Sequence, residues 1–258
     1  MSQAKSKIRI AMVSYLNSKP FEFGLKNGGY SKDFELITDT PFNCARLFVE
    51  HKVEIALIPS GALYDLTDGY DIITDFCIGC DGEVRTVCIF SNQPIERCKK
   101  LITDNHSGTS VLLSAFILDE VFNLKPDIIS DDVTNFNPST DDAVLMIGDK
   151  VFEKELSFKY KYDLGHIWKQ LTGLPFTFAV WVARKSVTAE TVHHLNQSFK
   201  IGMSGMNKII EQESSENLDL YYYFKNNISY SYDDQKKVSI DLFLKKTKKY
   251  HNQLITNC

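Results

Sequence analysis

The first 66 residues alternate between short apolar runs and helical patterns, which limits the folds open to this chain. Strands are expected at residues 7–13, 34–38 and 54–58. Helices are expected between them at residues 19–26 and 41–52, and the second begins with a proline, which is favourable in the first helical turn. Strands that alternate with helices build a parallel sheet with helices on its faces. The pattern therefore predicts an α/β fold.

A second series of strands and helices predicts a second lobe. Two strands at residues 72–78 and 84–91 are followed by a brief helix at 94–99. The strand–helix pattern then resumes, with elements expected at residues 101–103, 109–122, 128–129 and 143–147. A further apolar strand at residues 176–183 is expected to return to the first sheet.

Two sheets joined by crossover strands form two lobes with a cleft between them, and such clefts are preferred ligand sites. This α/β architecture resembles the two-lobed, periplasmic-binding-protein-like (type II) fold. We expect a discontinuous first lobe, residues 1–91 plus about 178–258, and a second lobe at residues 92–177.

The chain from Thr188 onward has a helical pattern. Thr188 can cap a helix, and further helices are expected at residues 219–226 and 233–247. Lysines near the end of the last helix complement the helix dipole. Two roles stay open for these C-terminal helices, which are packing against the first lobe and forming a homodimer.

Charge and hydropathy exclude several classes of function. The formal net charge of −4 argues against a broad nucleic-acid interface, which would be basic. No run of eighteen or more apolar residues occurs, so no membrane span and no membrane partner are expected. The first residues also lack the apolar core of a secretory signal, which predicts a cytoplasmic location.

The six cysteines are expected to be free, reduced thiols. Cys77 and Cys80 form a lone CxxC, whereas a structural zinc site needs a second pair or two histidines at matching spacing. The six histidines show no such spacing, so no metal is expected.

Small polar residues gather where strands end and helices begin. Five clusters do so, at residues 14–18, 59–60, 82–86, 107–110 and 148–149. Any one of them is explained by ordinary capping and turn chemistry. Their recurrence at positions expected to border the cleft favours a ligand site. Hydroxyls and free N–H groups at the helix start near Thr109 and Ser110 suit a carboxylate, so a small anionic ligand is expected.

The familiar catalytic signatures are missing. No GxSxG, P-loop, HExxH or GxGxxG pattern occurs. His106 is interpreted as a surface turn residue, and Arg85 has two open roles, a salt bridge or an anion clamp. Asp149 is either a helix N-cap or part of the cleft wall. These residues alone identify no reaction.

Several distinctive sequence blocks follow one another along the chain: VSYLNSKP, EIALIPS, DGEVRTVCIFS, TSV at a helix start, LMIGD and YDLGHIWKQLTGLPFTFAVWVA. In this order they resemble the chorismate dehydratases of the futalosine route to menaquinone, and the resemblance spans about residues 8–183. The enzymes that make 1,4-dihydroxy-6-naphthoate share the fold but have a different first block. They are therefore the second choice.

The resemblance implies an enzyme, a carbon–oxygen lyase. It would convert the dicarboxylate chorismate to 3-[(1-carboxyvinyl)oxy]benzoate and water without a metal or an organic cofactor. By matching position, Asn17 is the catalytic candidate, donating to the substrate where charge or the leaving hydroxyl develops. The substrate-binding candidates are Ser14, Tyr15, Ser60, Arg85, Thr86, Ser107, Thr109, Ser110 and Asp149.

Two positions depart from the family pattern. Thr86 stands where the family commonly has serine, and the hydroxyl is kept. Gly108 replaces an arginine of the usual SRTS block, and Arg85 or Lys19 is a candidate to compensate. No protein base is evident, so one hypothesis gives the proton to the substrate's own enolpyruvyl carboxylate. The rival interpretation is a solute-binding protein for a small anion.

Overall fold

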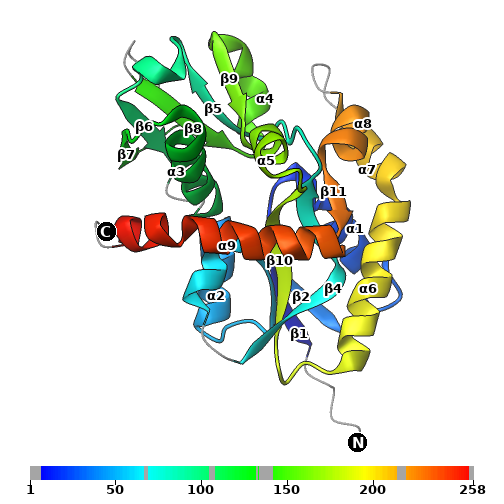
Figure 1. Cartoon of the computed structure of the whole chain (residues 1–258). Coiled ribbons are helices and arrows are strands. Elements are labelled where there is room, and N and C mark those ends of the chain that lie inside the picture. Colours follow the sequence, from blue (N-terminus) through cyan, green and yellow to red (C-terminus); the bar gives the residue numbers. More distant parts are fainter. Residues whose placement is uncertain are drawn as a thin grey trace, which may run out of the picture.

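The computed structural model describes residues 7–66, 69–104, 108–131, 133, 142–213 and 219–255. Two sheets form its framework (Figure 1). The six-stranded sheet has the order β11-β4-β10-β3-β1-β2, and the five-stranded sheet has the order β7-β6-β8-β5-β9. The predicted two-sheet α/β fold is therefore confirmed.

The first three strands pair in parallel, as the alternating pattern predicts. β1 (Ile8–Val13) lies between β2 (Phe34–Asp39) and β3 (Ile55–Pro59). β10 (Phe176–Arg184) returns to this sheet and runs antiparallel between β3 and β4 (Tyr70–Cys80). The central strands β3 and β10 are buried almost throughout, which explains their continuous apolar sequence.

The second sheet mixes parallel and antiparallel pairs. β8 (Asp142–Ile147) runs parallel to β6 and antiparallel to β5. The other strands are β5 (Val87–Ser91), β6 (Lys100–Thr103), β7 (Asp127–Ser130) and β9 (Tyr160–Asp163). Because Val87–Ser91 pairs within this sheet, we propose that the chain first crosses between the lobes at residues 81–86, ahead of the expected boundary at residue 91.

Helices α1 (Lys19–Asn27) and α6 (Ala189–Ser204) approach each other closely through two glycines. A Cβ atom on Gly24 would lie 1.9 Å from the Ser198 carbonyl oxygen, and one on Gly202 would lie 1.8 Å from the Pro20 carbonyl oxygen. Only glycine permits this approach. The predicted Thr188 cap of α6 is confirmed, since its hydroxyl accepts the Thr191 N–H at 3.2 Å.

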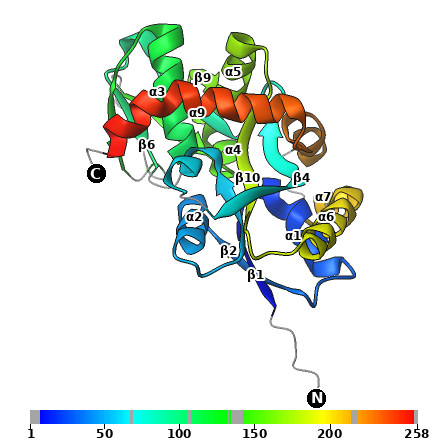
Figure 2. The ribbon, with the colours of Figure 1, turned by 60° about the horizontal axis from the view of Figure 1, so that its bottom comes forward.

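The C-terminal helix α9 (Asp234–Ile255) lies across both lobes (Figures 1 and 2). The Trp168 Nε1–H donates to Ser239 Oγ at 3.1 Å, and the Lys249 ammonium pairs with Asp119 at 2.9 Å. On the other side, the Tyr64 hydroxyl donates to the Leu244 carbonyl. Of the two open roles, packing against the first lobe is seen at Tyr64, and the helix packs against the second lobe as well. The homodimer stays a prediction.

The remaining elements are short helices and one edge strand. The pattern-based prediction missed β9, β11 (Ser229–Ser231) and α5 (Leu164–Thr172), and it indicated α4 (Lys150–Lys154) only through the candidate N-cap Asp149. The others are α2 (Pro41–Val49), α3 (Gly108–Phe122), α7 (Met206–Glu213), α8 (Leu220–Tyr222), the 3₁₀ turns η1 (Leu16–Ser18), η2 (Ser60–Asp65), η3 (Ile95–Arg97) and η4 (Glu155–Ser157), and the π-helical η5 (Tyr223–Asn227).

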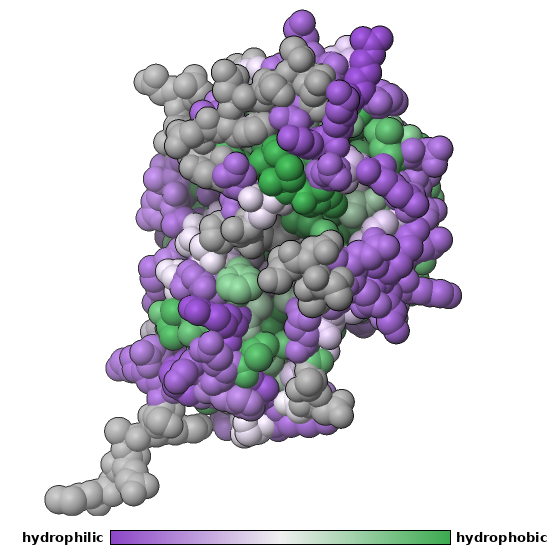
Figure 3. All heavy atoms as spheres, turned by 90° about the vertical axis from the view of Figure 1, so that its left-hand side faces the viewer, coloured by the Kyte–Doolittle hydropathy of each residue, from purple (hydrophilic) through white to green (hydrophobic). Residues whose placement is uncertain are grey.

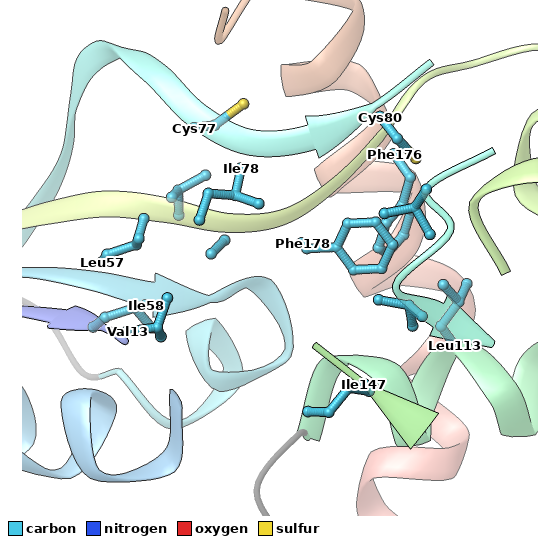
Figure 4. Packing of buried hydrophobic residues seen from close by; sticks show 14 of the residues in the cluster. Val13, Leu57, Ile58, Cys77, Ile78, Cys80, Leu113, Ile147, Phe176 and Phe178 are labelled. Carbon is cyan, nitrogen blue, oxygen red and sulfur yellow. The ribbon is translucent and has the colours of Figure 1, made fainter. Parts of the chain in front are cut away.

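One hydrophobic core extends from the first sheet into the second lobe. Val13, Leu57 and Ile58 lie on one side of Figure 4 and Ile147 and Leu113 on the other, with the Phe178 ring from β10 between them. The lobes therefore share apolar contacts.

Figure 3 shows one face that is hydrophilic over most of its area, with exposed apolar residues gathered above its centre. Within the described ranges, none of the helices is both long enough and apolar enough to span a membrane.

Candidate functional site

A pocket lies where the ends of strands from both sheets meet. It encloses about 540 Å³ of space free of atoms, its open mouth included. Val13, Pro59 and Ile147, at the carboxyl ends of β1, β3 and β8, line it, which is where α/β sheets place their ligand sites. Five polar candidates line it as well: Tyr15, Asn17, Thr86, Thr109 and Ser110.

Asn17 lies in the tight turn η1, which is held from several sides. The Ser18 hydroxyl donates to the Val13 carbonyl at 2.6 Å, and the Tyr230 hydroxyl donates to the Asn17 carbonyl at 2.9 Å. The side-chain Oδ1 of Asn17 is buried and has no hydrogen-bond partner among the described residues. A buried acceptor without a partner is costly, so this oxygen is suited to a ligand that donates a hydrogen bond.

Tyr15 packs its ring against the backbone of the other lobe at Gly148. Gly148 has a φ of +71°, and a Cβ there would lie 3.0–3.2 Å from three atoms of the Tyr15 ring. Burial, together with the nearby carboxylates of Asp104 and Asp149, raises the pKa of Tyr15 to about 12. The hydroxyl therefore stays protonated at neutral pH.

The Asp149 carboxylate has a partner within the chain. It accepts the Leu16 N–H at 3.1 and 3.2 Å and makes no capping bond to α4. Burial raises the pKa of Asp149 to about 6, although the Leu16 N–H acts in the opposite direction. Its neighbour Gly148 lines the pocket, whereas Asp149 is outside the lining.

The loop that carries Thr86 is held by the buried carboxylate of Asp163. This carboxylate accepts the N–H groups of Val84, Arg85 and His166 at 3.1, 2.7 and 2.9 Å. Arg85 adopts a φ of +66° in the loop. The prediction of a strand starting at residue 84 is therefore wrong, because these amides bond to Asp163 and the strand begins at Val87.

Besides Asp149, three further expected binding residues are outside the pocket lining. The Arg85 guanidinium pairs with Glu155 at 3.1 Å and lies over the Phe152 ring, so the salt-bridge interpretation is confirmed. The fully buried Ser60 donates its hydroxyl to the Thr177 carbonyl at 2.7 Å. Ser14 is exposed.

The start of α3 forms another wall of the pocket. The Gly61 N–H donates to Thr109 Oγ1 at 2.8 Å, and a Cβ on Gly61 would lie 2.9 Å from the Thr109 backbone. This contact fixes the helix start against the first lobe. The N–H groups at a helix start, together with the hydroxyls of Thr109 and Ser110, suit an anionic group. Ser107 and His106 lie outside the described residues.

The pocket lining contains no charged side chain in the described part of the chain. Lys19, considered above as a substitute for the missing arginine at position 108, pairs with Glu22 and Glu213 at 3.3 Å each. A ligand's carboxylates would therefore meet N–H groups and hydroxyls.

Tyr223 contacts the pocket residue Thr86 from outside the lining, and the sequence pattern did not reveal it. It begins η5, its side chain is 0% exposed, and its hydroxyl lies 3.3 Å from Thr86 Oγ1. Nearby in the sequence, Asp219 is recognisable as a helix cap, and its carboxylate does cap the preceding helix α8. A helix cap at this position does not indicate that Tyr223 reaches the pocket.

The described residues contain no group of three or more His, Cys, Asp or Glu side chains arranged to hold a metal ion. The five described cysteines are buried and free. Burial raises the pKa of Cys77 to about 12, so this thiol of the CxxC pair is protonated at neutral pH.

Two sequence comparisons relate this chain to known proteins. The sequence profile of a family described as menaquinone biosynthesis matches residues 8–249. A chorismate dehydratase from Thermus thermophilus is 23% identical over 224 residues, which are 80% of this chain and 81% of that protein.

Two solved structures have the same architecture. A protein from Archaeoglobus fulgidus superposes with a TM-score of 0.69 at 15% identity and covers 95% of this chain and 97% of its own. The periplasmic aliphatic sulphonate binding protein SsuA from Escherichia coli superposes with a TM-score of 0.66 at 11% identity. The superposition covers 97% of this chain and 89% of SsuA. The predicted periplasmic-binding-protein-like fold is confirmed.

Proposed function

Because the chain belongs to the menaquinone biosynthesis family, we propose that it is a chorismate dehydratase, a lyase that forms 3-[(1-carboxyvinyl)oxy]benzoate and water. The observation that carries the proposal is the buried amide oxygen of Asn17, which has no hydrogen-bond partner among the described residues and belongs to a pocket whose described lining is uncharged. The named relative from Thermus thermophilus supports it.

The reaction needs orientation more than a strong catalytic base. The hydrogen on the ether-bearing ring carbon is vinylogous to the ring carboxylate, so its removal gives a delocalised dienolate. The dienolate expels the neighbouring hydroxyl, the proton and hydroxide leave as water, and the ring becomes aromatic. The enzyme has to hold both carboxylates, orient the leaving hydroxyl and stabilise developing charge.

The pocket residues divide these tasks. One carboxylate would bind at the start of α3, where the Thr109 and Ser110 hydroxyls line the pocket. Thr86 and Asn17 also line the pocket, and they would orient the leaving hydroxyl. No carboxylate, imidazole or amine lines the pocket among the described residues, so we assign the proton to the substrate's own enolpyruvyl carboxylate.

Incubation of the purified protein with chorismate tests the proposal directly. Mass spectrometry should detect a product that is lighter than chorismate by one water. Asn17→Ala should lower kcat by about 10²-fold or more if the amide acts on the transition state. Unchanged chorismate after prolonged incubation with the folded wild-type protein would refute the dehydratase.

A solute-binding protein is the second candidate, because the fold is shared with the sulphonate binding protein SsuA. Calorimetry with chorismate separates the two. Tight binding without consumption favours a receptor, whereas turnover excludes a purely binding role. An analogue with an amidated side-chain carboxylate tests the proton acceptor, since unchanged turnover of this analogue would rule out the substrate-assisted step.

A further inference from the structure

The peptide that follows Asn17 is held by a tyrosine from the C-terminal part of the chain. The Tyr230 hydroxyl donates to the Asn17 carbonyl at 2.9 Å, across 213 residues of sequence. Resting on the proposed dehydratase function, we propose that Tyr230 is a positioning residue, which fixes this peptide and with it the direction of the Asn17 amide in the pocket. Tyr230 is outside the pocket lining, so it acts through Asn17.

The local sequence explains why the Asn17 carbonyl takes a distant donor. At the start of the 3₁₀ turn η1, the Tyr15 carbonyl accepts the N–H of Ser18, three residues ahead, at 3.0 Å. Three residues ahead of Asn17 stands Pro20, which has no N–H to donate. A partly buried carbonyl without a donor costs free energy, and the Tyr230 hydroxyl supplies the bond that the turn cannot make.

The turn is held on both sides of the Asn17 side chain. Before it, the Leu16 N–H donates to Asp149, and after it, Tyr230 holds the carbonyl. The backbone conformation decides which side-chain rotamers are allowed, so a fixed backbone limits where the amide can point. The amide oxygen has no hydrogen-bond partner of its own among the described residues, so its direction depends on this backbone.

The strand that carries Tyr230 is anchored by a buried lysine. β11 has three residues and lies at the edge of the first sheet (Figure 1). Lys236 Nζ, in α9, donates to Ser229 Oγ at 2.7 Å and to the Ser231 carbonyl at 2.6 Å, which are the two neighbours of Tyr230. Lys236 is 1% exposed, and Gly79 leaves room for it, since a Cβ there would lie 2.9 Å from Lys236 Cε. A buried ammonium requires its hydrogen bonds, so these bonds hold β11 in place.

Tyr230→Phe tests the proposal because it removes one hydroxyl and keeps the ring, which packs edge-on against Phe21 with centroids 5.5 Å apart. We expect kcat for chorismate to fall about tenfold while KM changes less than about twofold, since the loss affects orientation in the transition state. Tyr232→Phe is the matched control. Tyr232 is the next tyrosine along the chain, partly buried, with its ring 6.0 Å from the Lys237 ammonium. A change in KM alone, or equal effects of both variants, would overturn the proposal.

A double variant separates positioning from a general structural role, because Asn17→Ala deletes the amide and keeps the carbonyl that Tyr230 holds. If Tyr230 acts through the amide, adding Tyr230→Phe to Asn17→Ala should lower kcat by less than about twofold. The midpoint of urea unfolding should still fall by a similar amount in both backgrounds, because the same hydrogen bond is lost in each. A further tenfold fall in kcat in the Asn17→Ala background would show that Tyr230 supports the fold in general, and the proposal would fail.

An NMR measurement without substrate tests the geometry even if chorismate is not the substrate. In the wild-type protein the Tyr230 ring should show nuclear Overhauser effects to protons of Asn17, and this measurement does not depend on how the variants fold. The Asn17 side-chain NH₂ signals, assigned by their absence in Asn17→Ala, should shift in Tyr230→Phe and stay in place in Tyr232→Phe.

The two proposals fail in distinguishable ways. A Tyr230 ring without contact to Asn17, or NH₂ signals of Asn17 that stay in place in Tyr230→Phe, would refute the positioning role whatever the substrate is. Absence of chorismate turnover by the wild-type protein, with the contact and the shift both present, would refute the dehydratase and leave the geometry of the turn as proposed.

Discussion

The carboxylate of Asp149 accepts the backbone N–H of Leu16 across the cleft between the two lobes. Leu16 is the first residue of the turn that carries Asn17, so a side chain of the second lobe holds the catalytic candidate of the first. The Asp149 carboxylate is partly buried, which raises its pKa to about 6. The charged groups that act on it are Lys19, Glu213 and Glu153.

We expect kcat/KM to fall as the pH drops below about 6, because a protonated Asp149 is a weaker acceptor for Leu16. Asp149→Asn keeps an oxygen acceptor and should flatten this acidic limb of the pH–rate profile. Asp149→Ala removes the acceptor and should lower kcat at every pH. An acidic limb that persists unchanged in Asp149→Asn would assign the titration to another group.

The contribution of the Asp149 carboxylate to folding stability should depend on pH in the opposite direction from its effect on activity. The pKa of Asp149 is higher in the folded chain than its ordinary value of 3.8, so its contribution to stability is full below pH 3.8 and is lost as the pH rises through about 6. Urea unfolding of wild type and Asp149→Asn between pH 4 and 7 measures the difference. The wild type should lose stability relative to the variant over this interval, and two parallel curves would contradict the assignment.

Gly148→Ala should destabilise the protein by about 2–3 kcal/mol, combining left-handed backbone strain with a contact to the Tyr15 ring at 3.0 Å. Gly173→Ala is the matched control, because Gly173 has nearly the same φ, +72°, and nothing within 4 Å of the added carbon. Thermal unfolding of the two variants isolates the contact with Tyr15. Equal losses of stability would show that this contact is easily relieved.

Gly24→Ala should cost more than about 3 kcal/mol, because the added carbon would lie 1.9 Å from the backbone oxygen of Ser198 and would force α1 and α6 apart. Gly29→Ala provides the comparison, with nothing within 4 Å of its new Cβ. The measurement is the midpoint of denaturant unfolding. A near-neutral Gly24→Ala would mean that the two helices separate at little cost.

Thr109→Val should raise KM for chorismate by about tenfold, since it removes a hydroxyl from the pocket wall and leaves the Gly61 N–H without its acceptor. Thr109→Ser keeps the hydroxyl and should stay close to wild type. Initial rates over a range of chorismate concentrations measure both. If Thr109→Val left KM unchanged, Thr109 would not bind the substrate carboxylate.

Gly108→Arg introduces the arginine that the resemblance to chorismate dehydratases leads us to expect at the start of α3. A side chain fits there, because an added Cβ meets nothing within 4 Å. We expect KM for the dicarboxylate to fall about threefold or more, and more at low than at high salt, because a new cation would attract the substrate. Gly29→Arg is the control, because it adds the same charge away from the pocket. If KM fell equally in both variants, the effect would come from long-range attraction of the substrate and not from a contact at position 108.

The sequence by itself determined the local elements and the location of the site. Alternation of apolar runs with helical patterns predicted β1, β2 and β3 and their parallel pairing. Polar residues at strand ends and helix starts predicted a pocket that Asn17, Thr86 and Thr109 now line. Such features depend on neighbours along the chain and on the rule that parallel strands end at one edge, so they can be predicted without the tertiary structure.

Only the tertiary structure decided what each polar group bonds to. Ser60 and Arg85 belong to the predicted clusters, yet their side chains bond to Thr177 and Glu155. Tyr223 reaches Thr86 across 137 residues of sequence, and no periodicity records that contact. The physical reason is that a buried donor or acceptor takes whichever partner the packed lobes bring within reach, and the partners of this pocket come from distant parts of the chain.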